Sequence, residues 1–136
     1  MRVHLAPPLR AQILAEAQSP LECCGLLQGL RDGDVFQVMA LHAGANLAAS
    51  ATRFEIDPGL QFSAQKTARA QHQAIIGCYH SHPGGQAHPS ATDLAGAGED
   101  DFLWLIASGD ALNAFVYSRG GFARLDWVAD WVTSSE

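Results

Sequence analysis

The apolar positions along the chain follow a helical period in some stretches and form strand-like runs in others. Between residues 8 and 18 they recur every three to four residues behind two prolines that suit a helix start, which predicts an amphipathic helix. The runs 23–30 and 35–41 are apolar and flank a turn with the sequence RDGD. This pattern predicts a hairpin of core strands.

Asp57 followed by Pro58 has the form of a helix N-cap with proline in the first turn, so we predict a second helix over 58–73. A short strand is expected just before it, at 54–56. The run 74–79 is small and apolar, as in a buried strand. The remaining predicted elements are a third, short helix from Ser90 and strands over 102–107, 112–117 and 122–127.

About three helices interleaved with six or so strands predict a central mixed β-sheet with helices packed on it. The expected fold class is therefore α/β or mixed α+β, and not all-β. At 136 residues the chain is long enough for one sizeable core and too short for two ordinary domains. We expect residues 1–136 to form a single domain.

Composition and charge argue against several classes of function. Hydrophobic residues make up 48% and charged residues 16%, as in folded globular proteins. Asp and Glu outnumber Lys and Arg by 14 to 8, and the basic residues are scattered, which argues against nucleic acid as a partner. No apolar run has the length of a bilayer span or the form of a leader. We therefore expect a cytoplasmic protein that does not enter a membrane.

The three cysteines, Cys23, Cys24 and Cys78, are an odd number and have no CxxC spacing. This argues against a disulfide framework and against a cysteine-based zinc knuckle. We expect reduced thiols that pack in the core and act neither as nucleophiles nor as ligands.

A cluster of metal-ligating residue types follows the strand predicted at 74–79. His80 and His82 lie two positions apart, so on an extended segment both imidazoles project to one face. Asp93 can add a carboxylate, and two nitrogens with one oxygen leave a fourth tetrahedral position open, as in catalytic zinc sites. Magnesium or calcium would need more oxygen ligands than this segment offers. Zinc fits best, and other transition metals also fit.

Each part of this cluster also has an ordinary structural explanation. An HxH pair on a strand is more often packed or solvent-facing than part of a site. Ser90 and Asp93 have the S-x-x-D spacing of a helix capping box. The joint spacing in HSHPGGQAHPSATD decides between the two explanations, because proline and glycine there shape a loop that leads from a strand into a helix start.

This string resembles the motif of the JAMM metalloproteases, also called MPN+ or JAB. Their pattern is HxH, seven residues, Ser, two residues and Asp, with a distant upstream Glu, which Glu22 in PLECCGLLQG matches. The resemblance extends through Asn46 and the segment FEIDP at 54–58, and covers most of residues 9–118. It implies the JAB/MPN fold, a cytidine-deaminase-like sandwich of a mixed sheet flanked by helices.

The resemblance also implies roles for five residues. His80, His82 and Asp93 would bind one Zn²⁺ per chain, Glu22 would be the general base, and Ser90 would stabilise the oxyanion. The motif assigns nothing to the other histidines, so we expect none of them to be a ligand: His4, His42, His72 and His88.

The family hydrolyses the amide or isopeptide bond after the C-terminal Gly-Gly of ubiquitin or a ubiquitin-like protein. This short, insertion-poor chain resembles the prokaryotic branch, which implies the tail of a ubiquitin-like sulfur-carrier protein as substrate; a homodimer stays open. Two alternatives also stay open, a zinc hydrolase of small peptides or amidated metabolites and a non-catalytic scaffold. A nucleobase deaminase is excluded because its H-x-E and P-C-x-x-C signature is absent.

Overall fold

The computed structural model describes residues 1–45 and 56–128. Within them seven strands and three helices follow one another along the chain. In order they are β1 (Arg2–Leu5), α1 (Pro7–Glu16), β2 (Cys24–Asp32), β3 (Val35–Gly44), α2 (Pro58–Ala70), β4 (Ala74–Ser81), α3 (Ala91–Gly96), β5 (Phe102–Ser108), β6 (Ala111–Ser118) and β7 (Gly121–Trp127).

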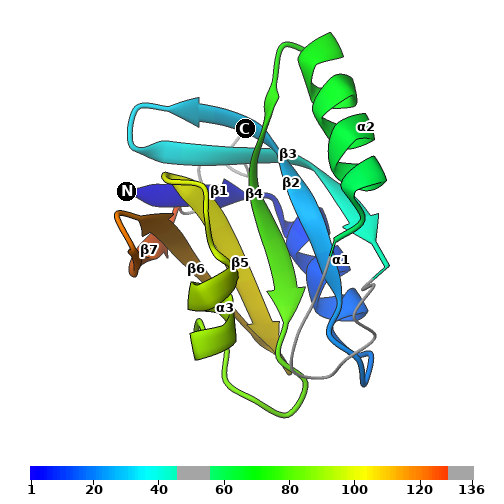
Figure 1. The fold of residues 1–136 in the computed structure, drawn as a ribbon, viewed down its shortest axis with the longest axis vertical. Coiled ribbons are helices and arrows are strands. Elements are labelled where there is room, and N and C mark those ends of the chain that lie inside the picture. The colour runs from blue at the N-terminus through cyan, green and yellow to red at the C-terminus, as the bar shows by residue number, and fades with distance from the viewer. Residues whose placement is uncertain (46–55, 129–136) are drawn as a thin grey trace.

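The strands form one closed sheet in the order β1-β3-β2-β4-β5-β6-β7, with β7 pairing back onto β1. The pairs β1–β3, β1–β7 and β4–β5 are parallel and the others are antiparallel. The predicted mixed sheet is therefore confirmed. The expected sandwich is not confirmed, because the sheet closes on itself and the helices flank it only in part (Figure 1).

Most predicted elements are present, with shifted ends. The hairpin is confirmed as β2 and β3, and α2 ends three residues before the predicted end at residue 73. Residues 54 and 55 of the predicted strand at 54–56 lie outside the described part, as does Asn46, and Ile56 is not in a strand. The strand β1 was not predicted. Its four residues are too few to show a recognisable alternation of apolar and polar positions, and its parallel pairing with β3 and β7 joins segments that are distant in the sequence.

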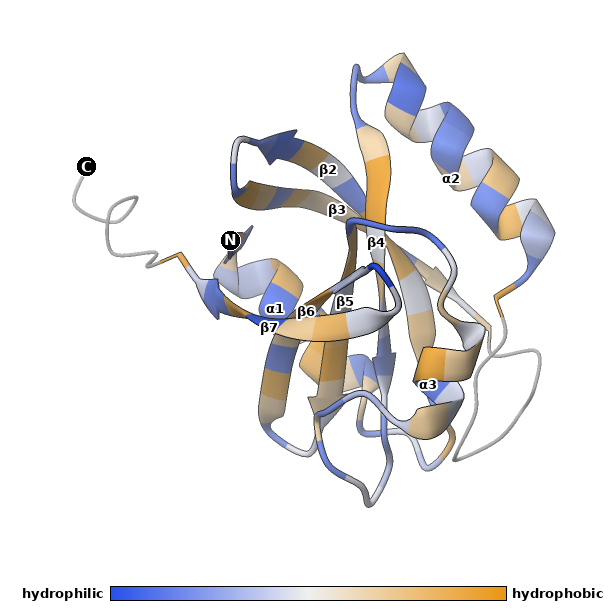
Figure 2. Ribbon diagram, turned by 60° about the vertical axis from the view of Figure 1, so that its left-hand side comes forward, coloured by the Kyte–Doolittle hydropathy of each residue, from blue (hydrophilic) through white to orange (hydrophobic). Residues whose placement is uncertain are grey.

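Apolar side chains form two clusters on opposite faces of the sheet, because successive residues of a strand point to opposite sides. On β5, Leu103 and Leu105 belong to one cluster, which also contains Ile13 of α1. Trp104 and Ile106 belong to the other, together with Ala64 of α2. Helix α2 is striped with polar and apolar residues, whereas β4 begins with an apolar segment (Figure 2).

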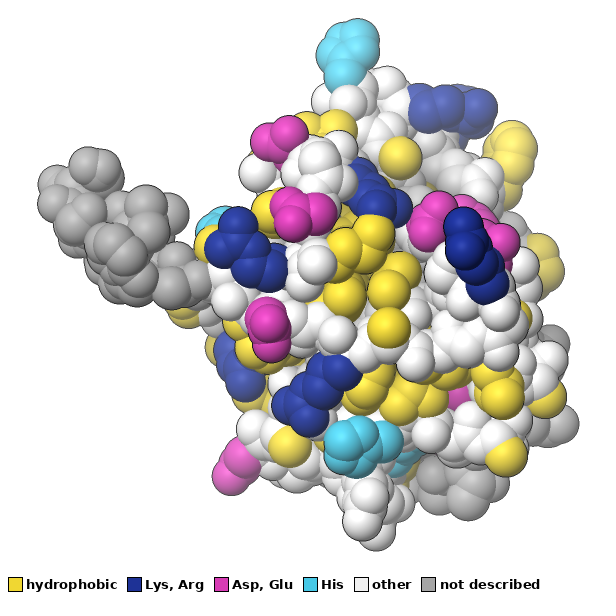
Figure 3. All heavy atoms as spheres, turned by 90° about the vertical axis from the view of Figure 1, so that its left-hand side faces the viewer, with side chains coloured by type: hydrophobic (Ala, Val, Ile, Leu, Met, Phe, Trp, Pro, Cys, Tyr) yellow, Lys and Arg dark blue, Asp and Glu magenta, His cyan; other side chains and the backbone are white. Residues whose placement is uncertain are grey.

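The molecular face in Figure 3 shows hydrophobic side chains gathered in the middle, with basic and acidic side chains interspersed around them. Aromatic rings of the second cluster lie edge to face beside one another, with 5.1 Å between the centroids of Trp104 and Phe122 and 5.3 Å between those of Tyr117 and Phe122. No helix in the described ranges is long and apolar enough to cross a bilayer.

The antiparallel pairing of β2 with β4 aligns two chain segments that the sequence separates widely. Cys24 lies opposite His80 and Leu26 lies opposite Cys78. Continued two residues before the start of β2, this register places Glu22 opposite His82, on the same face as Cys24 and His80. The pairing therefore brings three polar side chains from two strand ends into one region.

Two glycines allow close packing around β4. A Cβ atom at Gly25 would overlap the ring of Tyr79, which is fully buried. A Cβ atom at Gly77 would overlap the backbone carbonyl of Leu103 on β5. Neither neighbour has room to move aside, because both lie in the apolar cluster that contains Ile13.

Replacement of Gly77 by alanine should destabilise the protein by about 1–3 kcal/mol, because the added methyl group pushes β4 away from β5. Gly121 is the matched control, since a Cβ atom there meets nothing within 4 Å. Urea denaturation of the two alanine variants measures the difference. Equal stability of the two variants would contradict the packing argument.

Candidate metal centre

Three side chains from the end of β4 and the start of α3 converge on one point. The Nε2 atoms of His80 and His82 are 3.1 Å apart. The Asp93 carboxylate reaches both rings, with Oδ1 3.1 Å from Nε2 of His80 and Oδ2 3.0 Å from Nε2 of His82. Each ring nitrogen therefore contacts the other ring nitrogen and a different oxygen of the Asp93 carboxylate.

Asp93 also caps α3, as its spacing to Ser90 predicts. Its Oδ2 accepts a hydrogen bond from the backbone N–H of Ser90 at 2.9 Å, and its own N–H donates to Oγ of Ser90 at 3.0 Å. The cap and the cluster are thus two uses of one carboxylate. Because the Ser90 hydroxyl is only an acceptor in the cap, its hydrogen remains able to donate elsewhere.

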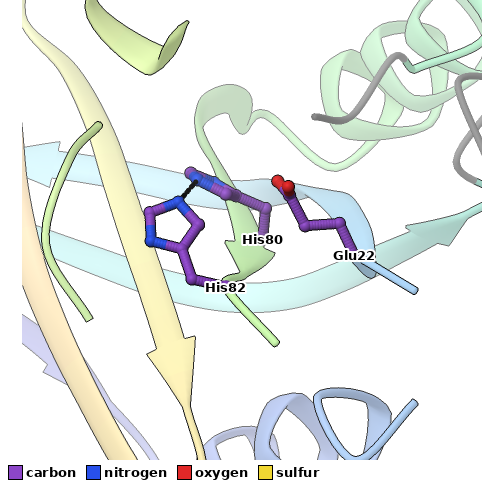
Figure 4. Close-up of side chains that lie close together, drawn as sticks. All are labelled: Glu22, His80 and His82. Carbon is purple, nitrogen blue, oxygen red and sulfur yellow. Dashed lines mark hydrogen bonds between the residues drawn. The ribbon is translucent and has the colours of Figure 1, made fainter. Parts of the chain in front are cut away.

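Glu22 lies beside the two histidines, as Figure 4 shows, with its carboxylate pointing toward them. It is 2% exposed, and a carboxylate oxygen and one nitrogen of each ring lie within 4.8 Å of one another. Two hydrogen bonds hold the adjacent backbone in place. The N–H of Cys23 donates to Oγ of Ser81 at 2.8 Å, and the N–H of Ser81 donates to the carbonyl of Cys23 at 3.1 Å.

The electrostatics of the site reflect competition between burial and pairing. Burial raises the pKa of Glu22 to about 7, with smaller and opposing effects from His82 and Asp93. Burial also opposes ionisation of Asp93, but its hydrogen bonds to the two histidines outweigh this and hold its pKa well below the ordinary value. Burial lowers the pKa of His80 more than Asp93 raises it. Asp93 therefore remains an anion.

Burial likewise opposes protonation of His82, but hydrogen bonds to Asp93 and to the Gln86 carbonyl outweigh it and raise its pKa. The Nδ1 atom of His82 lies 2.8 Å from that carbonyl and must donate to it, because a carbonyl only accepts. In the neutral ring Nε2 then carries a lone pair that faces an oxygen of Asp93.

This donor set is suited to a cation. Two acceptors 3.0 Å apart, Nε2 of His82 and Oδ2 of Asp93, repel each other unless a proton or a metal ion lies between them. The contacts of 3.0–3.1 Å between the two ring nitrogens, and between each ring nitrogen and one oxygen of Asp93, are close to the ~3.3 Å ligand-to-ligand edge of a tetrahedron with 2.0–2.1 Å zinc bonds. The three residues expected to bind the metal are thus brought together.

Two contributors to the site were not found from the sequence. Ser81 is the middle residue of HSH, and its fully buried hydroxyl joins β4 to the backbone after Glu22. The Gln86 carbonyl sets the orientation of the His82 ring. Because every residue has a backbone carbonyl, the identity of residue 86 does not reveal this contact. For Ser81, the only signal in the sequence was a small polar residue between the two histidines.

The remaining histidines and the cysteines have other surroundings. The ring of His88 lies 5.9 Å from that of Phe115, and Nε2 of His42 lies 2.7 Å from Oε1 of Gln28. All three cysteines are free, as expected. Burial raises the pKa of Cys24 to about 11 and that of Cys78 well above its ordinary value, so these thiols stay protonated.

A cleft of about 410 Å³ opens beside Asp93, between α2, α3 and β5. Its wall near the cluster is made of small side chains and backbone, at Thr92, Gly96 and Gly98. Its apolar lining residues include Phe102 and Trp104 of β5. The cleft is therefore lined by small residues next to Asp93 and by aromatic side chains of β5.

Residues 7–119 match the model of a protein family described as prokaryotic homologs of the JAB domain. The chain is 35% identical to a desampylase of Haloferax volcanii, over 95% of this chain and 90% of that protein. It is 31% identical to a desampylase of Pyrococcus furiosus, over 74% and 69%.

Two structures solved in solution are similar at 32% identity. One, from Desulfitobacterium hafniense, has a TM-score of 0.84, and the match covers 93% of this chain and 91% of that chain. The other, from Salinibacter ruber, has a TM-score of 0.71 and covers 94% and 90%. The likeness in sequence and in fold thus extends over nearly the whole chain.

Glu22→Gln should stabilise the metal-free protein in a pH-dependent way. Because burial raises the folded-state pKa from 4.5 to about 7, wild-type stability is lost as pH rises through that interval. The variant should gain little at pH 5 and up to about 3 kcal/mol at pH 8. Urea denaturation in EDTA at both pH values tests this, and an equal gain at the two values would contradict it.

Proposed function

The chain belongs to the family of prokaryotic JAB-domain homologues and is a JAB hydrolase, and from this premise we propose that it is a zinc-dependent isopeptidase. Its proposed substrate is the amide bond after the C-terminal Gly-Gly of a ubiquitin-like or sulfur-carrier protein. The single observation that carries the proposal is the convergence of His80, His82 and Asp93 at 3.0–3.1 Å, with Glu22 beside them.

His80, His82 and Asp93 would hold one zinc ion per chain. Two imidazole nitrogens and one carboxylate oxygen leave a coordination position open, as catalytic zinc sites require. Zinc bound there would act as a Lewis acid that acidifies water and polarises a substrate carbonyl. Glu22, His80 and His82 also form a group of ligand atoms within 4.8 Å, so Glu22 lies close enough to share a water molecule with the metal position.

Glu22 would serve as the general base. Its carboxylate would take a proton from the attacking water and return it to the departing amine nitrogen. A pKa raised by burial to about 7 suits a group that must both accept and release a proton near neutral pH. The pKa of Asp93 is lowered while that of Glu22 is raised, so the two carboxylates of the site can hold different protonation states.

Ser90 would stabilise the negative charge that develops on the carbonyl oxygen. Its oxygen accepts from the N–H of Asp93, which orients the hydroxyl at the edge of the cluster. The hydroxyl hydrogen can then donate to an oxygen bound between Ser90 and the histidines. The capping bond and the catalytic bond use different parts of the same group.

The cleft beside Asp93 is suited to the Gly-Gly end of the substrate tail. Small residues line it at Thr92, Gly96 and Gly98, and an extended chain without side chains can approach such a wall closely. Beyond the glycines, the apolar wall formed by Phe102 and Trp104 can contact the preceding residues of the tail. An entrance lined by small residues, if it admits only glycine, would give the enzyme its specificity.

Both relatives bear the name desampylase, which supports a ubiquitin-like substrate for this chain. The short connection from α3 to β5 leaves little protein to grip a second modifier, which supports a simple tail as the recognised element. We place the activity in the cytoplasm, where the three free thiols would stay reduced.

Purified protein should contain about one zinc ion per chain. Glu22→Gln should retain the zinc and lose on the order of a hundredfold or more in rate, because the general base is gone while the ligands remain. His80→Ala should lose the zinc and the activity together. Metal analysis and mass spectrometry, on a sulfur-carrier protein extended by a short peptide after Gly-Gly, provide the two measurements.

Three outcomes of that experiment would contradict the proposal. If the protein binds no zinc after loading, the proposed metal centre is wrong. If Glu22→Gln is fully active, the assignment of Glu22 as the general base is wrong. Cleavage of small amides with none of the extended carrier would favour a hydrolase of small peptides or amidated metabolites.

Gly98→Phe should block the cleft without disturbing the fold. A Cβ atom at Gly98 meets nothing within 4 Å, and the residue lines the cleft beside Asp93. The variant should keep its zinc and its stability, and kcat/KM on the Gly-Gly substrate should fall about tenfold or more because the tail is excluded. Gly121→Phe, also in open space, is the control, and equal activity of the two variants would refute the assignment of the cleft.

A further inference from the structure

The loop that joins β4 to α3 is fastened to the strands behind it by two side chains. Oγ of Ser108, at the end of β5, donates to the carbonyl of Gly85 at 2.6 Å. Nδ2 of Asn113, on β6, donates to the carbonyl of Ala87 at 3.0 Å. The loop carries His82 at its start and Ser90 at its end, so each bond fixes a different point of a segment that leads to the site.

The bond from Asn113 falls on the peptide next to the one that orients His82. The carbonyl of Gln86 accepts from Nδ1 of His82 at 2.8 Å, and the following carbonyl, that of Ala87, accepts from Asn113. Ala87 itself is 5% exposed. The segment 86–87 is therefore held on one side by the imidazole and on the other by the amide.

Arg124, on β7, determines which way the Asn113 amide faces. Its Nη2 donates to Oδ1 of Asn113 at 2.9 Å. A guanidinium has only donors, so the amide oxygen must face Arg124 and the amide nitrogen must face the Ala87 carbonyl. The contact with a charged donor also strengthens the bond. Arg124 on β7 therefore fixes the amide of Asn113 in the orientation that donates to the Ala87 carbonyl.

We infer that Asn113, oriented by Arg124, is a positioning residue for the proposed metal ligand His82. Two consecutive glycines, Gly84 and Gly85, precede the segment, and Gly84 has a positive φ of 72°. A loop of that composition has many other conformations open to it. Asn113 removes this freedom at Ala87, so the Gln86 carbonyl stays where it keeps Nδ1 of His82 protonated and Nε2 turned toward Asp93.

The inference rests on the proposed function only in taking His82 as a metal ligand. The orientation of the ring is a property of the metal-free protein and can be measured there. In metal-free wild type at pH 9, where the imidazole is neutral, the ¹⁵N chemical shifts of His82 should show the Nδ1–H tautomer. In Asn113→Leu, which has nearly the same size but no amide, the Nε2–H tautomer should appear in a substantial fraction.

Zinc affinity is the second readout, measured by competition with a chromophoric chelator. Asn113→Leu should raise the zinc dissociation constant about 10–100-fold, as loss of a partner that orients a metal-ligating histidine does. Arg124→Leu should raise the zinc dissociation constant about threefold or more. Arg124 is exposed, so its replacement should not endanger the fold. Ser108→Ala is the matched control, because it frees the same loop at Gly85 without touching the Gln86–Ala87 segment, and should change the dissociation constant less than about threefold.

Wild-type tautomer populations in Asn113→Leu, or a dissociation constant within about twofold of wild type, would overturn the inference. So would an equal loss in Ser108→Ala, which would assign the effect to general loosening of the loop. If the wild type fails to bind zinc, the proposed function fails instead, while the tautomer measurement still decides the role of Asn113. The two failures are therefore distinguishable.

Discussion

Antiparallel pairing of β2 with β4 sets Cys24 opposite His80, and the position of Glu22 relative to both histidines depends on this register. The pairing carries Glu22 from near the start of the chain to the HxH segment. Gly25 and Gly77 make the packing of β4 against its neighbours close enough to be rigid, since neither position has room for a Cβ atom. A slip of one residue would turn Glu22 to the opposite face and separate it from the histidines.

The same site concentrates groups that are costly to bury. Glu22 and His80 are almost fully buried, and in the absence of a cation the neutral form is favoured in each. Ionised Asp93 is kept by its hydrogen bonds to the two rings and to the helix terminus. A cation among the three acceptors would relieve their repulsion, so stability and metal binding are linked in this protein.

Several groups serve two purposes because the site is built from element ends. Asp93 caps α3 and faces both histidines, and Ser90 completes the cap while keeping a hydrogen to donate. Ser81 joins β4 to the backbone beside Glu22. The cleft next to these groups is lined in part by small residues, which leave space for a substrate.

The sequence by itself determined the features that depend on neighbours along the chain. These are the β2–β3 hairpin, the helix caps at Asp57 and Ser90, and the HxH pair whose alternation places both rings on one face. Glu22 entered only through resemblance to a family, because its closeness to His82 depends on strand pairing between distant segments. The tertiary structure alone decided the strand β1, the closure of the sheet and the contact of Asn113 with the loop. Local period and capping chemistry act over a few residues, whereas these contacts form only when the core brings distant segments together.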